Sequence, residues 1–305
     1  MPRIRTYSDL AEPDRSGILT QVTAQRSRVA ARLATVRHVV AVASGKGGVG
    51  KSFVTAGLAT ALVRSGRAIG VLDADLQSPT AARMLGVAIG RLEVTGDAVI
   101  PPRSADGIRV MSSDLLLAEG APLQWKEPAH ERFVWRGTLE TGMLREFLSD
   151  VEWGTLDVLL VDLPPGGDRL GALIELVPPP DLAGIVVVTI PSDASLRAVR
   201  RGVREARDRG VRVLGIVENM AGYACGKCGE ASPLFSGDAA QQLAKDADAP
   251  ILASIPFDPA IQVLTDSGQR TAASASSDSG QRTAASHSLS AMQQAVTTLL
   301  SRLAP

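Results

Sequence analysis

Two lysines stand in one glycine-rich stretch, Ser44-Gly-Lys-Gly-Gly-Val-Gly-Lys-Ser52. Gly45 is followed, after four residues, by Gly50-Lys51-Ser52, which is the spacing of a phosphate-binding loop. In such a loop, backbone N–H groups surround phosphate oxygens, the lysine reaches the β- and γ-phosphates, and the hydroxyl ligates Mg²⁺. A plain glycine turn would require neither the lysine nor the hydroxyl. The residues predicted to bind a nucleotide here are Gly45, Gly47, Gly48, Val49, Gly50, Lys51, Ser52 and Phe53.

Two acidic turns come directly after other apolar runs. Asp73-Ala-Asp75 follows the apolar run 68–72, and Asp162 follows the apolar run 157–161. A pair such as Asp73 and Asp75 is common in solvated turns, but an apolar strand ending in Asp162 is the Walker-B pattern, whose aspartate meets Mg²⁺ directly or through water. The following Pro164-Pro-Gly-Gly turn is suited to sensing a γ-phosphate. With the phosphate loop, these turns predict a Mg²⁺-dependent nucleotide hydrolase.

The only two cysteines, Cys225 and Cys228, have the spacing C-x-x-C. In a cytosolic chain this pair favours metal or redox chemistry over a structural disulfide. Zinc shared between subunits would need four such thiolates. A thioredoxin-like pair would open a helix just after a strand, whereas this pair follows Val217 in a glycine-rich loop, 222–229. Metal binding is therefore the preferred hypothesis, with zinc as one alternative.

The composition is that of a globular protein, with 45% hydrophobic and 21% charged residues among 305 and a formal net charge of zero. Neutral charge gives no reason to expect nucleic acid or an anionic membrane as a partner. The longest apolar runs, such as 182–190, are about half of a membrane span. The N-terminus lacks the apolar core of a secretory signal. We expect a cytoplasmic location.

Apolar runs alternate with helical patterns along the chain. Strands are expected near 39–43, 68–72, 108–112, 157–161, 184–190, 211–217 and 250–255, and helices near 53–65, 138–149, 194–209, 236–247 and 288–303. Because strands such as 157–161 are apolar on both faces, the pattern predicts an α/β fold with a doubly wound, mostly parallel sheet. One domain, 38–305, accounts for these elements. A leader, 1–37, is expected to be helical over 18–37 and to pack on that domain.

A segment near the C-terminus is duplicated. Asp266 to Ser274 recurs as Asp278 to Ser286, which predicts a lengthened low-complexity loop over 266–286. The helix expected after it has one apolar face and a single basic residue, Arg302. A membrane-surface helix normally has several basic residues, so this face is expected to pack on the core.

The motifs together resemble a known family. Lys46-Gly-Gly-Val-Gly-Lys51-Ser52, Asp73-Ala-Asp75, Trp135-Arg-Gly, Asp162-Leu-Pro-Pro-Gly, Val217-Glu-Asn219-Met and Cys225-x-x-Cys228 follow the order found in the Mrp/ApbC iron–sulfur cluster carrier ATPases. That family belongs to the deviant Walker-A class of P-loop NTPases, with MinD, ParA and nitrogenase iron protein. The resemblance extends from about Val39 to about Ser267, and the C-x-x-C pair separates carriers from MinD and ParA.

The resemblance implies roles for individual residues. Lys46 would cross a nucleotide-sandwiched homodimer to the phosphates bound by the other subunit, as an arginine finger does elsewhere. The other roles follow from motif position: Lys51 would assist catalysis on the phosphates, Asp75 would orient the attacking water, Ser52, Asp73 and Asp162 would serve the metal, and Asn219 and Pro256 would contact the adenine.

The same resemblance gives Cys225 and Cys228 a role as ligands of an iron–sulfur cluster. A cluster needs four thiolates and each chain offers two, so we expect a [4Fe-4S] cluster that bridges two subunits. The implied function is an ATP-dependent carrier that receives clusters from an assembly scaffold and transfers them to apo-proteins.

Two departures from the family pattern leave alternatives open. The turn Pro164-Pro-Gly-Gly-Asp168 is one residue shorter than the family's Pro-Pro-Gly-Thr-Gly-Asp, and Gln77-Ser78 replaces a Tyr-Gly pair. Slower hydrolysis, or a binding scaffold without turnover, is therefore an alternative. A further alternative, which does not depend on these departures, is a MinD/ParA-like positioning switch, which would respond to lipid or DNA.

Overall fold

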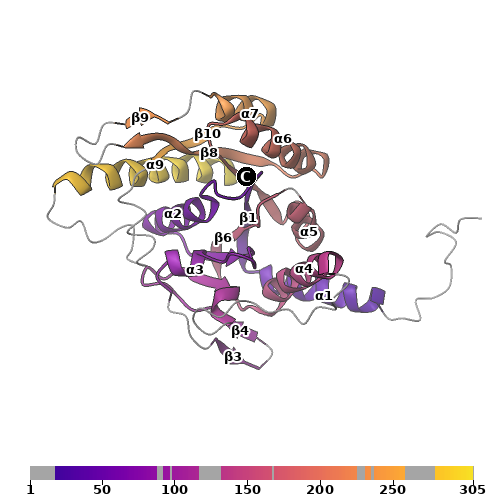
Figure 1. The fold of residues 1–305 in the computed structure, drawn as a ribbon. Helices are drawn as coiled ribbons and strands as arrows, with labels where there is room; N and C mark the ends of the chain where they lie inside the picture. The colour runs from indigo at the N-terminus through magenta and orange to yellow at the C-terminus, as the bar shows by residue number, and fades with distance from the viewer. Residues whose placement is uncertain are drawn as a thin grey trace, which may run out of the picture.

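The protein is built around one central sheet, seen in a computed structural model that describes residues 18–87, 92–96, 98–116, 132–166, 168–224, 231–234, 237–257 and 279–304 (Figure 1). The strands of this sheet are β1 (Val36–Ser44), β2 (Ile69–Asp73), β5 (Arg109–Ser112), β6 (Leu156–Asp162), β7 (Leu182–Thr189), β8 (Val213–Ala224), β9 (Ala231–Pro233) and β10 (Ile251–Phe257). A separate antiparallel pair is formed by β3 (Glu93–Thr95) and β4 (Ala98–Ile100).

Seven strands of the sheet are parallel, in the order β10-β8-β7-β1-β6-β2-β5, and β9 pairs antiparallel with β8. The chain first moves from the central β1 toward β5 and later returns past β1 to β10. The strand order therefore reverses around β1, which lies between β6 and β7. Ligands of such sheets bind outside the carboxyl ends of the strands at this point.

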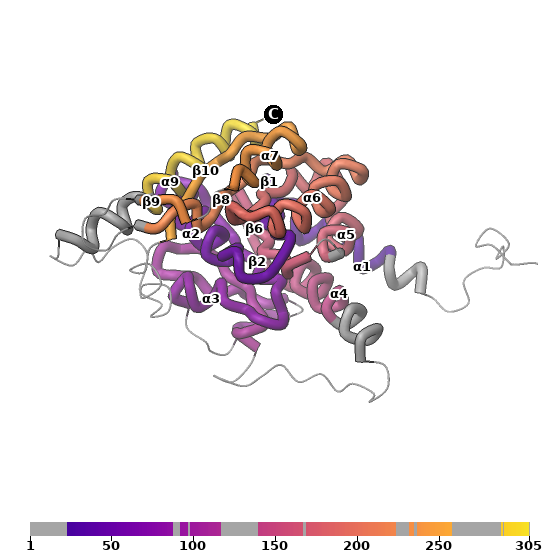
Figure 2. The backbone as a smooth tube through the Cα atoms, turned by 45° about the horizontal axis from the view of Figure 1, so that its top comes forward, coloured from indigo at the N-terminus to yellow at the C-terminus, as the bar shows by residue number. Residues whose placement is uncertain are grey.

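Helices cover both faces of the sheet (Figures 1 and 2). One face carries α1 (Ile18–Leu33), α4 (Arg132–Asp150), α5 (Asp168–Leu176), α6 (Asp193–Asp208) and α7 (Ala239–Ala247). The opposite face carries α2 (Lys51–Arg64), α3 (Ala81–Met84) and α9 (Ser279–Leu303), and the short 3₁₀ helix η2 (Ser113–Leu116) follows β5. The fold is thus a doubly wound α/β sandwich of three layers, as the sequence predicted.

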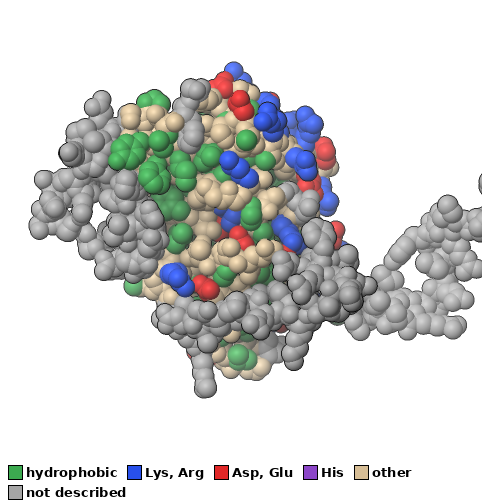
Figure 3. Space-filling model, viewed as in Figure 1, with side chains coloured by type: hydrophobic (Ala, Val, Ile, Leu, Met, Phe, Trp, Pro, Cys, Tyr) green, Lys and Arg blue, Asp and Glu red, His purple; other side chains and the backbone are tan. Residues whose placement is uncertain are grey.

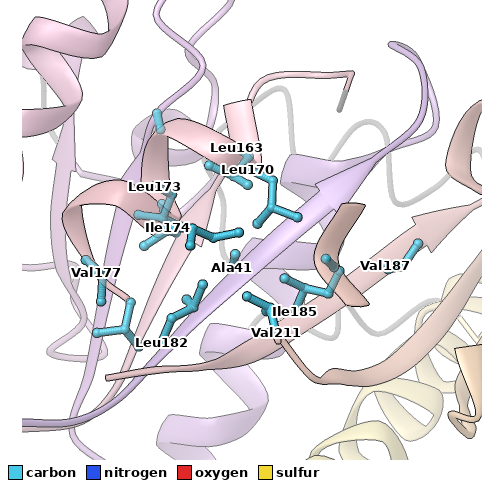
Figure 4. Close-up of a cluster of buried hydrophobic side chains, with 14 of the residues drawn as sticks. Ala41, Leu163, Leu170, Leu173, Ile174, Val177, Leu182, Ile185, Val187 and Val211 are labelled. Atoms are coloured by element: carbon cyan, nitrogen blue, oxygen red, sulfur yellow. The ribbon is translucent and has the colours of Figure 1, made fainter. Parts of the chain in front are cut away.

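Alternate residues of the strands supply the two cores. Val39 and Ala41 of β1 pack in one hydrophobic cluster, and Val40 and Val42 in the other. Figure 4 shows the first of these clusters, where side chains of α5 approach Ala41 and the neighbouring strand β7. Apolar residues on both faces of a strand are what a buried parallel sheet requires, and they explain why these runs do not alternate with polar residues.

The seven predicted parallel strands are confirmed, but some bounds and helices differ. β8 continues to Ala224 rather than ending at Val217, so the predicted loop 222–229 begins with strand residues. Antiparallel pairing with β9, with Tyr223 opposite Ser232, stabilises this extension. The helix α5 was not predicted, since it is short and lies between two proline-rich turns.

The leader contains a helix that packs on the domain, as expected. It ends at Leu33 rather than 37 because β1 already begins at Val36. Val29 and Leu33 are buried in the core, and the Arg32 guanidinium donates to the Ser149 carbonyl of α4 over 3.2 Å.

The C-terminal helix is longer than the apolar pattern predicted. α9 begins at Ser279 rather than 288, so the loop predicted over 266–286 is wrong from Ser279 onward, where the second copy of the duplicated segment is helical. Residues 266–278 of that prediction lie outside the described residues. Its apolar face packs on α2 and on β8 and β10, with Met292, Val296 and Leu299 buried, as expected for core packing. Within the described residues, no helix is long and apolar enough to cross a membrane.

Candidate active site

The glycine-rich loop lies where the sequence placed it, between β1 and α2. Gly50 has φ 78°, a left-handed conformation that favours glycine, and α2 begins at the next residue, Lys51. The N-terminal N–H groups of α2 and their dipole are therefore available at the carboxyl edge of the sheet, where an anion is stabilised. Gly48 also has positive φ, at 76°.

Asp162 lies at the centre of this site. Its carboxylate is fully buried at the end of β6 and accepts hydrogen bonds from Ser52 Oγ at 2.6 Å and Thr55 Oγ1 at 2.8 Å. Lys51 Nζ lies 2.7 Å from Asp162 Oδ1 and is itself nearly buried. The first turns of α2 thus direct an ammonium and two hydroxyls to one carboxylate, and the structure brings together three of the predicted residues, Lys51, Ser52 and Asp162.

Asp73 is tied to its own turn. Oδ2 accepts from the backbone N–H groups of Thr80 at 2.9 Å and Ala81 at 3.0 Å and from Ser112 Oγ at 3.3 Å, while Oδ1 accepts from the Asp75 N–H at 3.1 Å. These bonds hold the turn between β2 and α3 and thereby place Asp75. The assistance of Asp73 to a metal stays a prediction.

The environment of Asp73 makes its ionisation costly. Burial, and after it the negative charge of Asp162, raise the pKa of Asp73 to about 7. The Ala81 N–H and the Lys51 ammonium oppose that rise in pKa. Two carboxylates in one buried region therefore share the positive charge of Lys51.

Lys46 and Asp75 lie on the more accessible side of the site. Both are partly exposed, and the Lys46 carbonyl accepts from Ser44 Oγ at 3.1 Å. The Ser78 N–H donates to Asp75 Oδ1 at 3.3 Å. Both side chains therefore remain reachable from outside the chain, and their predicted catalytic roles stay predictions.

Asn219 supports the phosphate loop. This buried residue donates from Nδ2 to the Val49 carbonyl over 2.9 Å. A Cβ at Gly50 would lie 2.2 Å from the same Nδ2, so glycine is needed there for space as well as for its positive φ. Ile255 pairs with Asn219 across β10 and β8, so the other predicted base-contacting residue, Pro256, lies next to this position. Their contact with adenine stays a prediction.

Gly45 fixes the loop against α6. A Cβ on Gly45 would lie 2.4 Å from the backbone nitrogen of Val199 and 2.6 Å from the carbonyl carbon of Ala198. By contrast, the one described residue that a Cβ on Gly47 would meet within 4 Å is Pro165, at 3.9 Å, in the turn after Asp162. Glycine at position 45 therefore allows the phosphate loop to pack closely against α6.

Cys225 and Cys228 lie outside the described residues, in the segment that joins β8 to β9. The two strands pair closely, because a Cβ on Gly222 would lie 2.6 Å from the Ser232 carbonyl oxygen. Within the described ranges, no group of three or more His, Cys, Asp and Glu side chains could hold a metal. Apolar side chains gather over β8, β9 and β10 in Figure 3, and the exposed ones include Tyr223, Leu234 and Phe257.

The donors at the phosphate loop suit Mg²⁺, which prefers hard oxygen ligands and usually takes only one or two carboxylates from protein. The Ser52 hydroxyl and the Asp162 carboxylate lie 2.6 Å apart and offer that combination. Both groups also hydrogen-bond within the site, so their orientation is fixed before any cation arrives. The chemistry of this pair therefore fits the predicted metal.

Sequence reasoning missed two parts of the site. Thr55 bonds the central carboxylate, and its position three residues after Ser52, on the same face of α2, was the available signal. Glu140 of α4 bonds Gln77 and Arg169, which follow the two acidic turns, and no local pattern marks that contact.

Residues 35–296 match the model of the ParA family described as NUBPL iron-transfer P-loop NTPase. The chain belongs to this family. An iron-sulfur cluster carrier protein of Saccharolobus solfataricus is similar to this P-loop NTPase at 36% identity, with 82% of this chain and 81% of the relative covered. The cytosolic Fe-S cluster assembly factor NUBP2 of Bos taurus is 42% identical, with 78% and 85% covered.

A solved structure has the same fold. The nucleotide-binding protein of Archaeoglobus fulgidus, in complex with ADP, superposes on this P-loop NTPase with a TM-score of 0.67 and 36% identity, covering 80% of this chain and 91% of the other. The resemblance drawn from the motifs is thereby confirmed at the level of family and fold.

Proposed function

We propose that the protein is an ATP-dependent carrier of iron–sulfur clusters, which holds a cluster between two copies of the chain and transfers it to apo-proteins. The observation that carries this proposal is the assembled site at Asp162, in a chain whose relatives are named cluster carriers and assembly factors. Hydrolysis of ATP would be coupled to holding and releasing the cargo.

The chain's own residues account for nucleotide binding. Backbone N–H groups of the loop and the N-terminus of α2 would surround the phosphates, and Lys51 would move from Asp162 toward the β- and γ-oxygens. Ser52 and Asp162 would hold Mg²⁺, which neutralises charge on the phosphates when bound. Asp75 would orient water, and Asn219 keeps the loop in register.

Two copies would complete what one chain lacks. Lys46 would supply positive charge to the phosphates of the other subunit, and Cys225 and Cys228 from each copy would give a [4Fe-4S] cluster its four thiolates. The cysteines follow β8, the strand that also carries Asn219. A rearrangement at the phosphate loop could therefore reach the cluster ligands through the Asn219–Val49 hydrogen bond and the strand that follows Asn219.

We further propose that an assembly scaffold supplies the cluster and that the protein acts in the cytoplasm. The second point is supported by the bovine relative, which is named a cytosolic factor. Because the formal net charge is zero, we propose neither a lipid membrane nor a nucleic acid as a partner.

Anaerobic reconstitution tests the proposed cargo. The protein is incubated with ferrous iron and sulfide, desalted, and examined by visible absorbance and by iron and sulfide analysis. Wild type should retain a coloured cluster, whereas Cys228→Ser should retain almost none. Retention of a full cluster by Cys228→Ser would contradict the proposal. Wild type that retains zinc alone, when zinc is added together with ferrous iron and sulfide, would also contradict it.

A further inference from the structure

One nearly buried carboxylate links the two acidic turns of the site. Glu140 on α4 is 6% exposed. Its Oε1 accepts from Gln77 Nε2 at 2.7 Å, and its Oε2 forms an ion pair with the Arg169 guanidinium. The two partners use different oxygens of the carboxylate, so Glu140 holds both at once.

The partners of Glu140 belong to the segments that would sense a γ-phosphate. Gln77 lies in the turn held by Asp73, two residues after Asp75. Arg169 lies in the first turn of α5, just after the turn that follows Asp162. Each segment leaves the sheet at the carboxyl end of its own strand, and Glu140 reaches both from a third element.

Burial makes this link sensitive to both partners. A carboxylate removed from water is stabilised only while its cationic and hydrogen-bonding partners stay in place. Burial also lowers the pKa of Arg169, so this guanidinium depends on its anionic partner as well. A displacement of either turn therefore weakens the hold on the other.

We propose that Glu140 is a positioning residue that couples the turn carrying Asp75 to the turn after Asp162, so that both segments respond together to the γ-phosphate. This inference rests on the proposed use of ATP.

A double-mutant cycle tests the coupling. Gln77→Ala, Arg169→Ala and the double variant are compared by the ratio of the dissociation constants for ADP and a non-hydrolysable ATP analogue, both with Mg²⁺. Each single variant should lower the ratio. The double variant should lower it only slightly more than either single variant, so that its effect differs by about fivefold from the product of the two single effects. In the Glu140→Ala background the departure should vanish.

Three further variants guard against a loss of folding. Glu140→Gln keeps an acceptor for Gln77 and loses the charge that holds Arg169, so it should match Arg169→Ala. Arg200→Ala and Gln242→Ala remove a comparable pair, in which Arg200 bonds Asp246 and Gln242 between α6 and α7, and should leave the ratio unchanged.

Multiplicative effects of Gln77→Ala and Arg169→Ala, or a wild-type ratio for Glu140→Gln, would overturn the inference. A purely structural role would lower the midpoint of thermal unfolding but leave the ratio as it was, and that outcome would also overturn it. The measurement needs neither turnover nor a cluster. A protein that loads no cluster yet shows the coupling would contradict only the proposed cargo.

Discussion

At the scale of single residues, the site depends on how many donors hold Asp162. Thr55→Val removes one donor and nearly preserves volume at a fully buried position, so the carboxylate loses part of its orientation. We expect ATP turnover to fall roughly tenfold, as for other residues that orient a metal ligand. Phosphate release under saturating Mg-ATP measures it.

Thr60 gives a matched control for that variant. It is also buried on α2, but its hydroxyl donates to the Ala56 carbonyl of the same helix rather than to Asp162. Thr60→Val should change stability slightly and leave turnover at the wild-type level. Equal losses of turnover in both variants would mean that the hydroxyl on Asp162 has no special role.

Glu218 shows the cost of a buried carboxylate. Burial raises the pKa of Glu218 above its usual 4.5, although a hydrogen bond from Ser254 opposes the rise. The folded protein therefore favours the protonated acid, so the stability that Glu218 contributes is present below pH 4.5 and is lost as pH rises through the raised pKa.

Glu218→Gln should therefore raise the midpoint of thermal unfolding at pH 8, because the amide keeps an acceptor for Ser254 and needs no ionisation. The gain should shrink as pH falls toward 4.5. Thermal scans of both proteins across this range measure the difference. A gain that grows on acidification has the opposite sign and would refute this account.

Residue types predicted much of the site. Lys51, Ser52 and Asp162 could be identified from sequence because phosphate and Mg²⁺ chemistry demands those groups at those spacings, and the structure brings them together. Glu140 could not be predicted, because a glutamate on a helix is usually solvated and only the tertiary fold brings Gln77 and Arg169 to it.

At the scale of elements, the phosphate loop and α6 are packed without spare room. Gly45→Ala would place a methyl carbon 2.4 Å from the Val199 backbone nitrogen, and backbone cannot yield as a flexible side chain can. We expect a loss of about 1–3 kcal/mol in the free energy of unfolding. Chemical denaturation measures it.

Gly202, on the helix α6 that Gly45 packs against, provides a control whose substitution should change the free energy of unfolding in the opposite direction. A Cβ there meets no atom of the described residues within 4 Å, and Gly202 lies inside α6. Gly202→Ala should therefore stabilise the protein by about 0.5–1 kcal/mol, because alanine loses less conformational freedom on forming a helix. If both substitutions stabilise the protein, the contact between loop and helix is not tight.

Elements were predictable where their apolar pattern is strong. Parallel strands such as β6 and β7 are buried on both faces and read as continuous apolar runs. The extension of β8 and the short β9 carry no such pattern, because each is stabilised by pairing with the other. The helical start of α9 lies in a Ser- and Ala-rich duplication, whose composition indicated a loop.

At the scale of the whole molecule, we propose that each of two chains contributes residues to a site on the other. Lys46→Ala should leave ADP affinity near the wild-type value, because Lys51 remains in its own loop, but should reduce turnover roughly a thousandfold, as loss of an arginine finger does. Binding and phosphate-release assays on the same preparation measure the two effects. A parallel fall in ADP affinity would place Lys46 in its own subunit's site.

The most direct test concerns the number of chains around one cluster. After anaerobic reconstitution with Mg²⁺ and a non-hydrolysable ATP analogue, molar mass is measured by light scattering and iron and sulfide are measured in the same fraction. We expect a dimer with one cluster for every two chains, and a colourless protein for Cys228→Ser. A monomer that carries a whole cluster, or one cluster for each chain, would contradict it.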